Sequence, residues 1–190
     1  FRVAAEYNVP SWRLSGYYGE VAANFNPEVG FLQRSDFREI GAGIFFRLRH
    51  LLGFQEVRPH TWYQGFWNFD GFHETGKWHK DIHWEFKGGH EIHTGVNTTR
   101  EGVLEPFTIW KDPKDPTDVV EVEPGTYDHV ELALSGFTNR GAPLSVGFRL
   151  TAGGFFGGDR FLFGPSIRWR VGERFNGEIA ISRNDIDLPG

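Results

Sequence analysis

The 190-residue sequence contains neither cysteine nor methionine. A chain without cysteine forms no disulfide framework, has no thiolate ligands for zinc and carries no cysteine nucleophile. Its chemistry must therefore come from imidazole, carboxylate, hydroxyl and basic side chains.

Long apolar runs and an excess of positive charge are also missing. No window approaches the roughly 18 to 20 consecutive apolar residues that a transmembrane helix needs. If this chain lies in a membrane, it must cross as strands. The formal net charge is −5, and no basic stripe opposes it, which argues against a nucleic-acid partner.

Recognised catalytic motifs are absent too. The sequence has no Gly-x-Ser-x-Gly elbow and no His-Glu-x-x-His pattern. Glu28, Asp36 and Glu39 are candidates for the paired carboxylates of a glycoside-cleaving enzyme. The sequence gives no separation between them, and loop composition explains Asn26-Pro27-Glu28 as turn chemistry. We predict no catalytic residues and no cofactor.

Aromatic residues and glycine are abundant. Aromatics make up 16% of the chain, with 19 Phe and 7 Trp, there are 25 Gly, and only 39% of the residues are hydrophobic. This balance is typical of a wall one residue thick, apolar on one face and wet on the other. Apolar and polar residues alternate with a period of two along most of the chain, which indicates strands.

The alternation predicts an all-β chain, an antiparallel up-and-down meander of about nine or ten long strands in one unit, residues 1–190. Several strands reach 10 to 13 residues, whereas globular strands are typically about five or six and a membrane-crossing strand needs about 9–11. We therefore expect part of a transmembrane β-barrel, with long loops at about 22–36 and 100–126. The expected strands are 2–9, 11–21, 37–49, 56–69, 77–87, 90–99, 127–138, 143–155, 160–171 and 175–187, with a possible short one at 104–110.

The hairpin of 77–87 and 90–99 allows its register to be derived. A three-residue loop, Lys87-Gly88-Gly89, pairs Trp84 with Ile92 and separates an apolar face from a charged one, whereas a two-residue turn mixes the faces. The charged face then carries a polar cluster: His79, Asp81, His83, Glu85, Glu91 and His93.

This polar cluster is a candidate metal or solute site, because opposed imidazoles beside carboxylates can hold Zn²⁺ or Cu²⁺. A hydrated lumen wall explains the same residues, so we assign no metal. Arg149, Arg168 and Arg170 form a candidate inward basic patch; pairing with Glu131 and Glu178 is the preferred interpretation.

Trp12, Trp78, Trp84 and Trp169 are candidates for aromatic girdles at the membrane interfaces. Stacking on sugar rings is the alternative. A barrel leaves Ile40, Ile44, Phe148 and Ile167 on the outside, whereas a sandwich buries them.

Three stretches resemble a known family: Asn24-Phe25-Asn26-Pro27-Glu28-Val29-Gly30-Phe31, Gly153-Gly154-Phe155-Phe156-Gly157-Gly158-Asp159 and Asn184-Asp185-Ile186-Asp187-Leu188-Pro189-Gly190. Leu104-Glu105-Pro106-Phe107 and Glu123-Pro124-Gly125-Thr126-Tyr127 also fit. Together they resemble the C-terminal domain of unknown function of large Gram-negative envelope proteins that begin with a family 9 carbohydrate-binding-type module.

The resemblance implies a barrel in the bacterial outer membrane, with outer-membrane lipid as a partner and a possible link to polysaccharide through the N-terminal module. It implies no chemistry and carries over no catalytic residue. We expect both ends of the sequence to be cut. Two alternatives stay open: a soluble periplasmic β-sandwich that binds carbohydrate, and a carbohydrate-active enzyme of the envelope.

Overall fold

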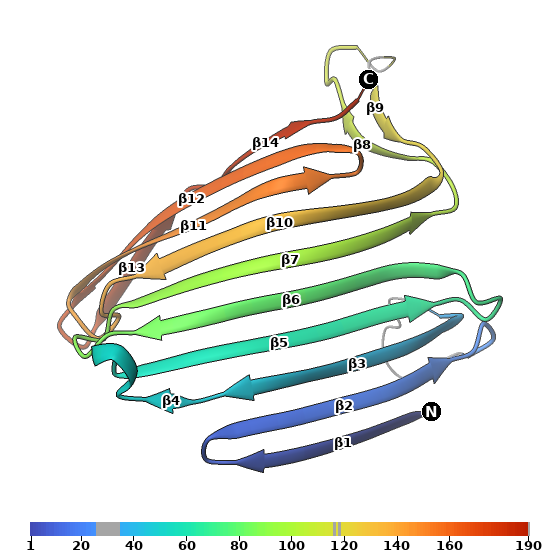
Figure 1. Ribbon diagram of the computed structural model, residues 1–190. Coiled ribbons are helices and arrows are strands. Elements are labelled where there is room, and N and C mark those ends of the chain that lie inside the picture. Colours follow the sequence, from blue (N-terminus) through green and yellow to red (C-terminus); the bar gives the residue numbers. More distant parts are fainter. Residues whose placement is uncertain (26–34, 116, 118, 190) are drawn as a thin grey trace.

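Strands make up nearly all the regular structure in the computed structural model, which describes residues 1–25, 35–115, 117 and 119–189 (Figure 1). A single 3₁₀ turn, η1 (Leu51–Gly53), interrupts them. The strands are β1 (Arg2–Val9), β2 (Trp12–Val21), β3 (Phe37–Phe46), β4 (Leu48–Arg49), β5 (Glu56–Trp67), β6 (His73–Glu85), β7 (Glu91–Val103), β8 (Phe107–Lys111), β9 (Val119–Val122), β10 (Gly125–Phe137), β11 (Leu144–Phe155), β12 (Gly158–Val171), β13 (Phe175–Ala180) and β14 (Arg183–Asp187).

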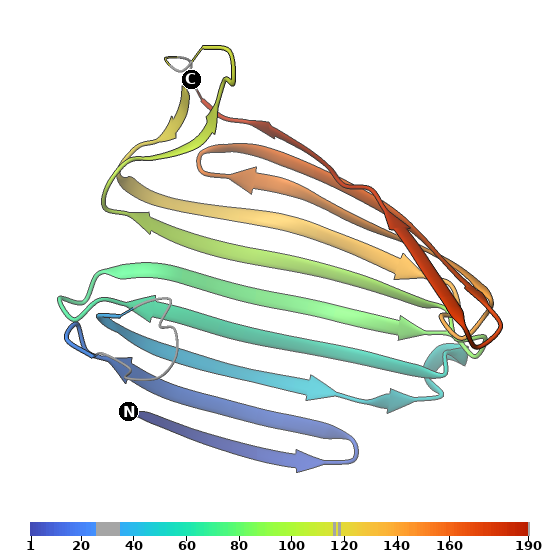
Figure 2. The same ribbon diagram turned by 180° about the vertical axis from the view of Figure 1, so that it is seen from behind.

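Twelve of these strands form one antiparallel sheet in the order β1-β2-β3-β5-β6-β7-β10-β11-β12-β13, with β4 paired to β5 and β14 paired to β12. The predicted all-β meander is confirmed. The sheet is curved and open, and among the described residues no pairing joins β1 to β13 or β14 (Figures 1 and 2). β8 and β9 pair only with each other and stand off one end of the sheet.

Two predicted strands are broken where a proline removes a backbone donor. The β3–β5 pairing ends at Phe45↔His60, next to Pro59, and resumes only at Leu48↔Val57, so 37–49 divides into β3 and β4. Pro165 donates no hydrogen bond but accepts one from the Ile181 amide at 3.1 Å. The edge strand predicted at 175–187 divides there into β13 and β14.

The connection between β7 and β10 is shorter than the 100–126 expected, and the possible short strand at 104–110 corresponds to β8. β7 continues to Val103, β10 begins at Gly125, and a hairpin of β8 and β9 fills the space between them. Sequence alternation misses the end of β7 because it is polar on both faces. Arg100 pairs there with Asp128 of β10 through two hydrogen bonds of 2.8 Å.

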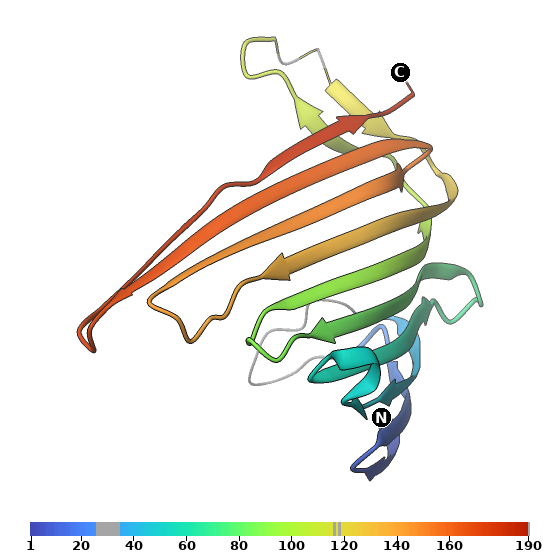
Figure 3. The same cartoon turned by 60° about the vertical axis from the view of Figure 1, so that its left-hand side comes forward.

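The two faces of the sheet differ in chemistry, and no second layer covers either face among the described residues. On the apolar face Leu132 and Val130 are 60% and 53% exposed. Ile40, Phe148 and Ile167 are exposed as well, while Ile44 is half-buried. The opposite, polar face carries the ionic side chains, and Figures 2 and 3 show how the sheet curves. There Glu131 is buried to 5% exposure.

Packing is lateral. Val57 and Val122 are the only buried hydrophobic residues among those described, at 3% exposure each. Cohesion therefore comes from the ladder and from cross-strand side-chain pairs, which are the stabilising unit of a sheet.

The pairing of β7 with β10 across the inserted hairpin can be tested with cysteines, because the natural chain has none. Val96 faces Leu132 in the register, within the geometric range for a disulfide. We expect Val96→Cys with Leu132→Cys to form an intramolecular disulfide under mild oxidation, seen as a mobility shift on non-reducing gels. Val96→Cys with Ala133→Cys is the control, because Ala133 projects from the other face; efficient crosslinking of that pair would contradict the register.

Candidate functional site: a histidine and carboxylate cluster on the polar face

The polar cluster lies where β5, β6 and β7 run side by side. The predicted hairpin register is confirmed: Trp84 faces Ile92 and His83 faces His93. The three-residue loop ends on Gly89 with a φ of 77°, the left-handed conformation that glycine adopts readily. The imidazoles of His83 and His93 stack, with ring centroids 3.6 Å apart.

His60 of β5 also belongs to the cluster, which sequence reasoning missed. Its ring centroid lies 5.3 Å from that of His79 and 5.0 Å from that of His83. The period-two pattern of β5 was the only signal. The β5–β6 register was not derivable, because an irregularity at Phe66 and Trp67 shifts the pairing.

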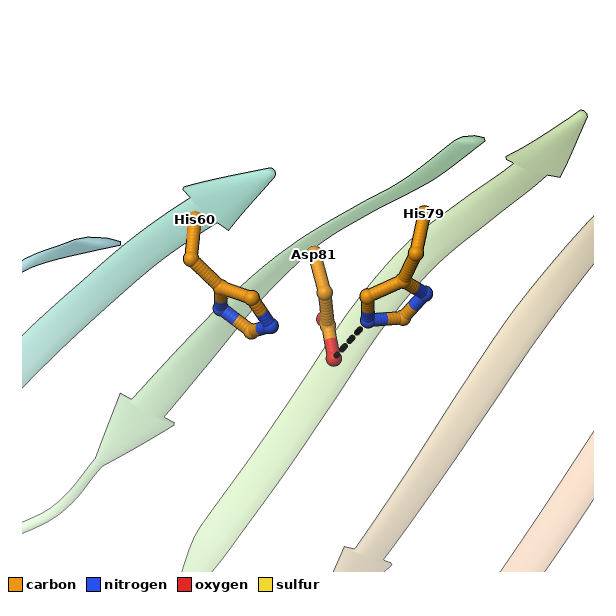
Figure 4. A group of neighbouring side chains, drawn as sticks. All are labelled: His60, His79 and Asp81. Atoms are coloured by element: carbon orange, nitrogen blue, oxygen red, sulfur yellow. Dashed lines mark ion pairs between the residues drawn. The ribbon is translucent and has the colours of Figure 1, made fainter. Parts of the chain in front are cut away.

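Asp81 occupies the centre of the cluster. Its Oδ2 lies 3.2 Å from His83 Nε2 and 3.7 Å from His79 Nε2. The side chain is only 10% exposed, and its Oδ1 is buried without a hydrogen-bond partner among the described residues. Figure 4 shows the Asp81 carboxylate between the imidazoles of His60 and His79.

Arg58 closes the cluster on its other side. Its guanidinium lies 3.7 Å from Glu56 and 3.4 Å from Glu85, and it donates a hydrogen bond to Glu91. Glu91 Oε1 in turn contacts His93 Nε2 at 2.8 Å and His83 Nδ1 at 3.2 Å. One guanidinium therefore compensates three carboxylates, two of which belong to the predicted cluster.

Glycines on the polar face let side chains meet across an intervening strand. Gly153 lies opposite both Glu131 and Arg160, and Arg160 reaches over it to Glu131, with Nε to Oε1 at 2.9 Å. Gly41 likewise lies between Tyr17 and Gln64, whose side chains are joined by a hydrogen bond of 2.9 Å. An added Cβ would collide with the Tyr17 ring at Gly41 and with the backbone of Val130 and Glu131 at Gly153.

The predicted basic patch is dispersed into separate contacts. Arg168 pairs with Glu178 at 2.7 Å, as the preferred interpretation had it. Arg170 donates a hydrogen bond of 2.9 Å to the Gly141 carbonyl. Arg149 is exposed on the same face and has no ion pair among the described residues. Glu131 forms an ion pair with Arg160, a partner that the sequence did not identify.

The four tryptophans of the predicted girdle all lie on the apolar face. Trp12, Trp84 and Trp169 lie near strand ends, at the end of the sheet where the β1–β2, β6–β7 and β12–β13 turns lie (Figure 1). Trp78 lies mid-strand, because β6 begins at His73, and donates to Thr61 Oγ1 at 2.6 Å. Three of the four tryptophans therefore lie at the same end of the strands.

The carboxylates considered for glycoside cleavage are placed only in part. Glu28 lies outside the described residues. Glu39 is on the polar face, where it accepts hydrogen bonds from Tyr17 and, at 2.7 Å, from Gln64. Asp36 precedes β3 with a φ of 65°.

Comparisons with known proteins return no match. No family model, curated protein or solved structure matches this chain. Function must therefore be argued from the geometry of the sheet and of the cluster.

Arg58 and Arg168 allow a matched test of the network. Arg58 is 21% exposed with three carboxylate neighbours, whereas Arg168 and Glu178 are 48% and 47% exposed. We expect Arg58→Ala to lower the free energy of unfolding by about 2–3 kcal/mol, because it removes one charge-assisted hydrogen bond and two ion pairs from half-buried carboxylates. Arg168→Ala should cost less than about 1 kcal/mol. Urea unfolding followed by tryptophan fluorescence measures both; equal losses would contradict the network.

Proposed function

We propose that this chain forms part of the wall of a bacterial outer-membrane β-barrel. The observation that carries the proposal is the single-layered sheet, whose apolar face is uncovered while its opposite face holds a connected set of ionic side chains. Hydrocarbon tails would cover the first face, and water in the lumen would solvate the second.

The apolar face is extensive. Exposed large hydrophobic residues occur on neighbouring strands across the sheet, including Ile40 of β3, Ile92 of β7, Leu132 of β10, Val146 of β11 and Phe163 of β12. Monomeric soluble proteins rarely expose contiguous apolar patches larger than a few hundred Å². A lipid environment removes this cost across the whole face at once.

Strand length supports the same proposal. β5, β6, β7, β10, β11 and β12 are each 12 to 14 residues long. A tilted strand needs about 9–11 residues to cross the hydrocarbon region, so these strands would cross it and extend beyond. In the described part of the chain, no helix has the length and apolar character of a membrane span.

The open edges set a requirement on the proposal. In lipid every backbone donor and acceptor must be paired within the protein, so spanning sheets are closed. β1 and the β13–β14 line would therefore pair with further strands, supplied by the same polypeptide or by another copy. The role would be passage of hydrophilic solutes, anchoring or surface display. The resemblance to envelope proteins adds a possible link to polysaccharide.

The membrane proposal predicts a reversal of accessibility between two adjacent residues. Leu132 is 60% exposed on the apolar face, and Ala133 is half-buried on the polar face. In phosphatidylcholine vesicles we expect Leu132→Cys to resist a water-soluble maleimide, because lipid covers it, while Ala133→Cys reacts. The labelled fraction, measured by mass spectrometry, checks this.

Detergent-solubilised protein is the control, in which the difference between the two cysteines should shrink. Two results would overturn the proposal: a folded chain that stays in the supernatant after vesicles are pelleted, or a Leu132→Cys variant that reacts as fast in vesicles as Ala133→Cys does. The first would favour a soluble carbohydrate-binding module.

A further inference from the structure

Among the described residues, two groups of three side chains place potential ligand atoms within 4.8 Å of one another: His60, His79 and Asp81, and Asp81, His83 and His93. The two groups share Asp81 and differ in how their imidazoles are oriented. That difference decides which group suits a metal ion.

In the first group, hydrogen bonds fix the tautomer of both histidines. His60 Nδ1 lies 3.3 Å from the Arg58 carbonyl, which only accepts, so this nitrogen carries the proton. His79 Nδ1 lies 2.7 Å from Asn97 Oδ1 and donates to it in the same way. Both Nε2 atoms are therefore left as acceptors within the group, and that of His79 lies 3.7 Å from Asp81 Oδ2. Metal-binding histidines are oriented by outer-shell partners in this way.

In the second group both imidazoles are also held by Glu91, which belongs to neither group. His93 Nε2 contacts Glu91 at 2.8 Å, and His83 is held between Asp81 and Glu91. The two rings are stacked face to face, so their in-plane lone pairs cannot converge on one ion without rotation.

Asp81 supplies a second, independent indication. Its side chain is nine-tenths buried, and its Oδ1 has no hydrogen-bond partner among the described residues. A buried carboxylate oxygen left unpaired is costly, and a cation beside it would remove the cost. Gly95 and Ala133 lie in line with Asp81 on the neighbouring strands, so no large side chain covers the carboxylate from that direction.

We propose that His60, His79 and Asp81 bind one divalent transition-metal ion of the Zn²⁺ type. Two imidazoles and one carboxylate suit Zn²⁺ and Cu²⁺, whereas Ca²⁺ and Mg²⁺ require oxygen ligands. Tetrahedral binding at about 2.0–2.2 Å brings the ligand atoms closer together by roughly an ångström, which small χ rotations supply. The fourth position faces the polar side of the sheet and accepts water or a solute donor.

Co²⁺ is the probe, because tetrahedral Co²⁺ absorbs visible light and Zn²⁺ displaces it. The intact chain, folded in detergent micelles, is titrated with Co²⁺ and then with Zn²⁺. We expect saturation at one equivalent and displacement by Zn²⁺. His60→Ala, His79→Ala and Asp81→Asn should each weaken Zn²⁺ binding by at least about tenfold. Asn97→Ala should weaken it less, because it removes only the orienting acceptor.

Two histidine variants serve as matched controls. His129→Ala removes another half-buried imidazole of the polar face that belongs to neither group, and His93→Ala removes a ligand of the second group only. His129→Ala should bind within about twofold of the unmodified chain, and His93→Ala should lose less affinity than His60→Ala, His79→Ala or Asp81→Asn. Circular dichroism confirms that every variant is folded.

Absence of saturable Co²⁺ or Zn²⁺ binding by the folded chain would overturn the assignment. So would a loss in His129→Ala or His93→Ala equal to that in Asp81→Asn. The measurement does not depend on membrane insertion, so the metal site and the barrel wall stand or fall separately.

Discussion

The constraint on which this structure depends is that buried charged side chains on a single-layered sheet must pair with other side chains of the same face, because no second layer supplies partners. No second layer packs against the polar face among the described residues, so ionic side chains there find partners within the same sheet, on their own strand or on strands beside it. Glu131 and Arg160 show the consequence. They come from strands two apart, and the glycine between them leaves the gap through which they meet. Because glycine has no side chain to stand between the two partners, an ion pair or hydrogen bond can cross a whole strand at these positions.

The same constraint shapes the histidine cluster. Imidazoles and carboxylates from β5, β6 and β7 are crowded together because a non-hydrogen-bonded pair brings opposed side chains close. His83 and His93 are such a pair, and their rings stack. Arg58 compensates the charge of three carboxylates, and Asp81 lies beside the imidazoles of His79 and His83. The cluster is electrostatically connected: Glu91 contacts an arginine and two histidines. Removal of one member therefore changes the surroundings of several others.

Sequence reasoning predicts what is local and fails where distant strands meet. The all-β meander followed from alternation, and the β6–β7 register followed from requiring that apolar and charged residues separate. His60 was missed because the β5–β6 pairing contains an irregularity that no pattern reveals. The partnership of Arg160 with Glu131 was missed because it spans an entire strand. Pro59 and Pro165 are visible in the sequence, but their effect depends on which neighbouring strand their ring nitrogen faces.

The hairpin of β8 and β9 makes all of its ladder hydrogen bonds within itself, while β7 and β10 pair from Gly125↔Val103 to Phe137↔Glu91 as if it were absent. The hairpin contacts the body of the protein through Phe107, whose ring lies against that of Phe156. This hairpin can therefore change in length or sequence during evolution without disturbing any hydrogen-bonded pair between β7 and β10. Diversity at this end of the molecule is therefore decoupled from the architecture that supports it.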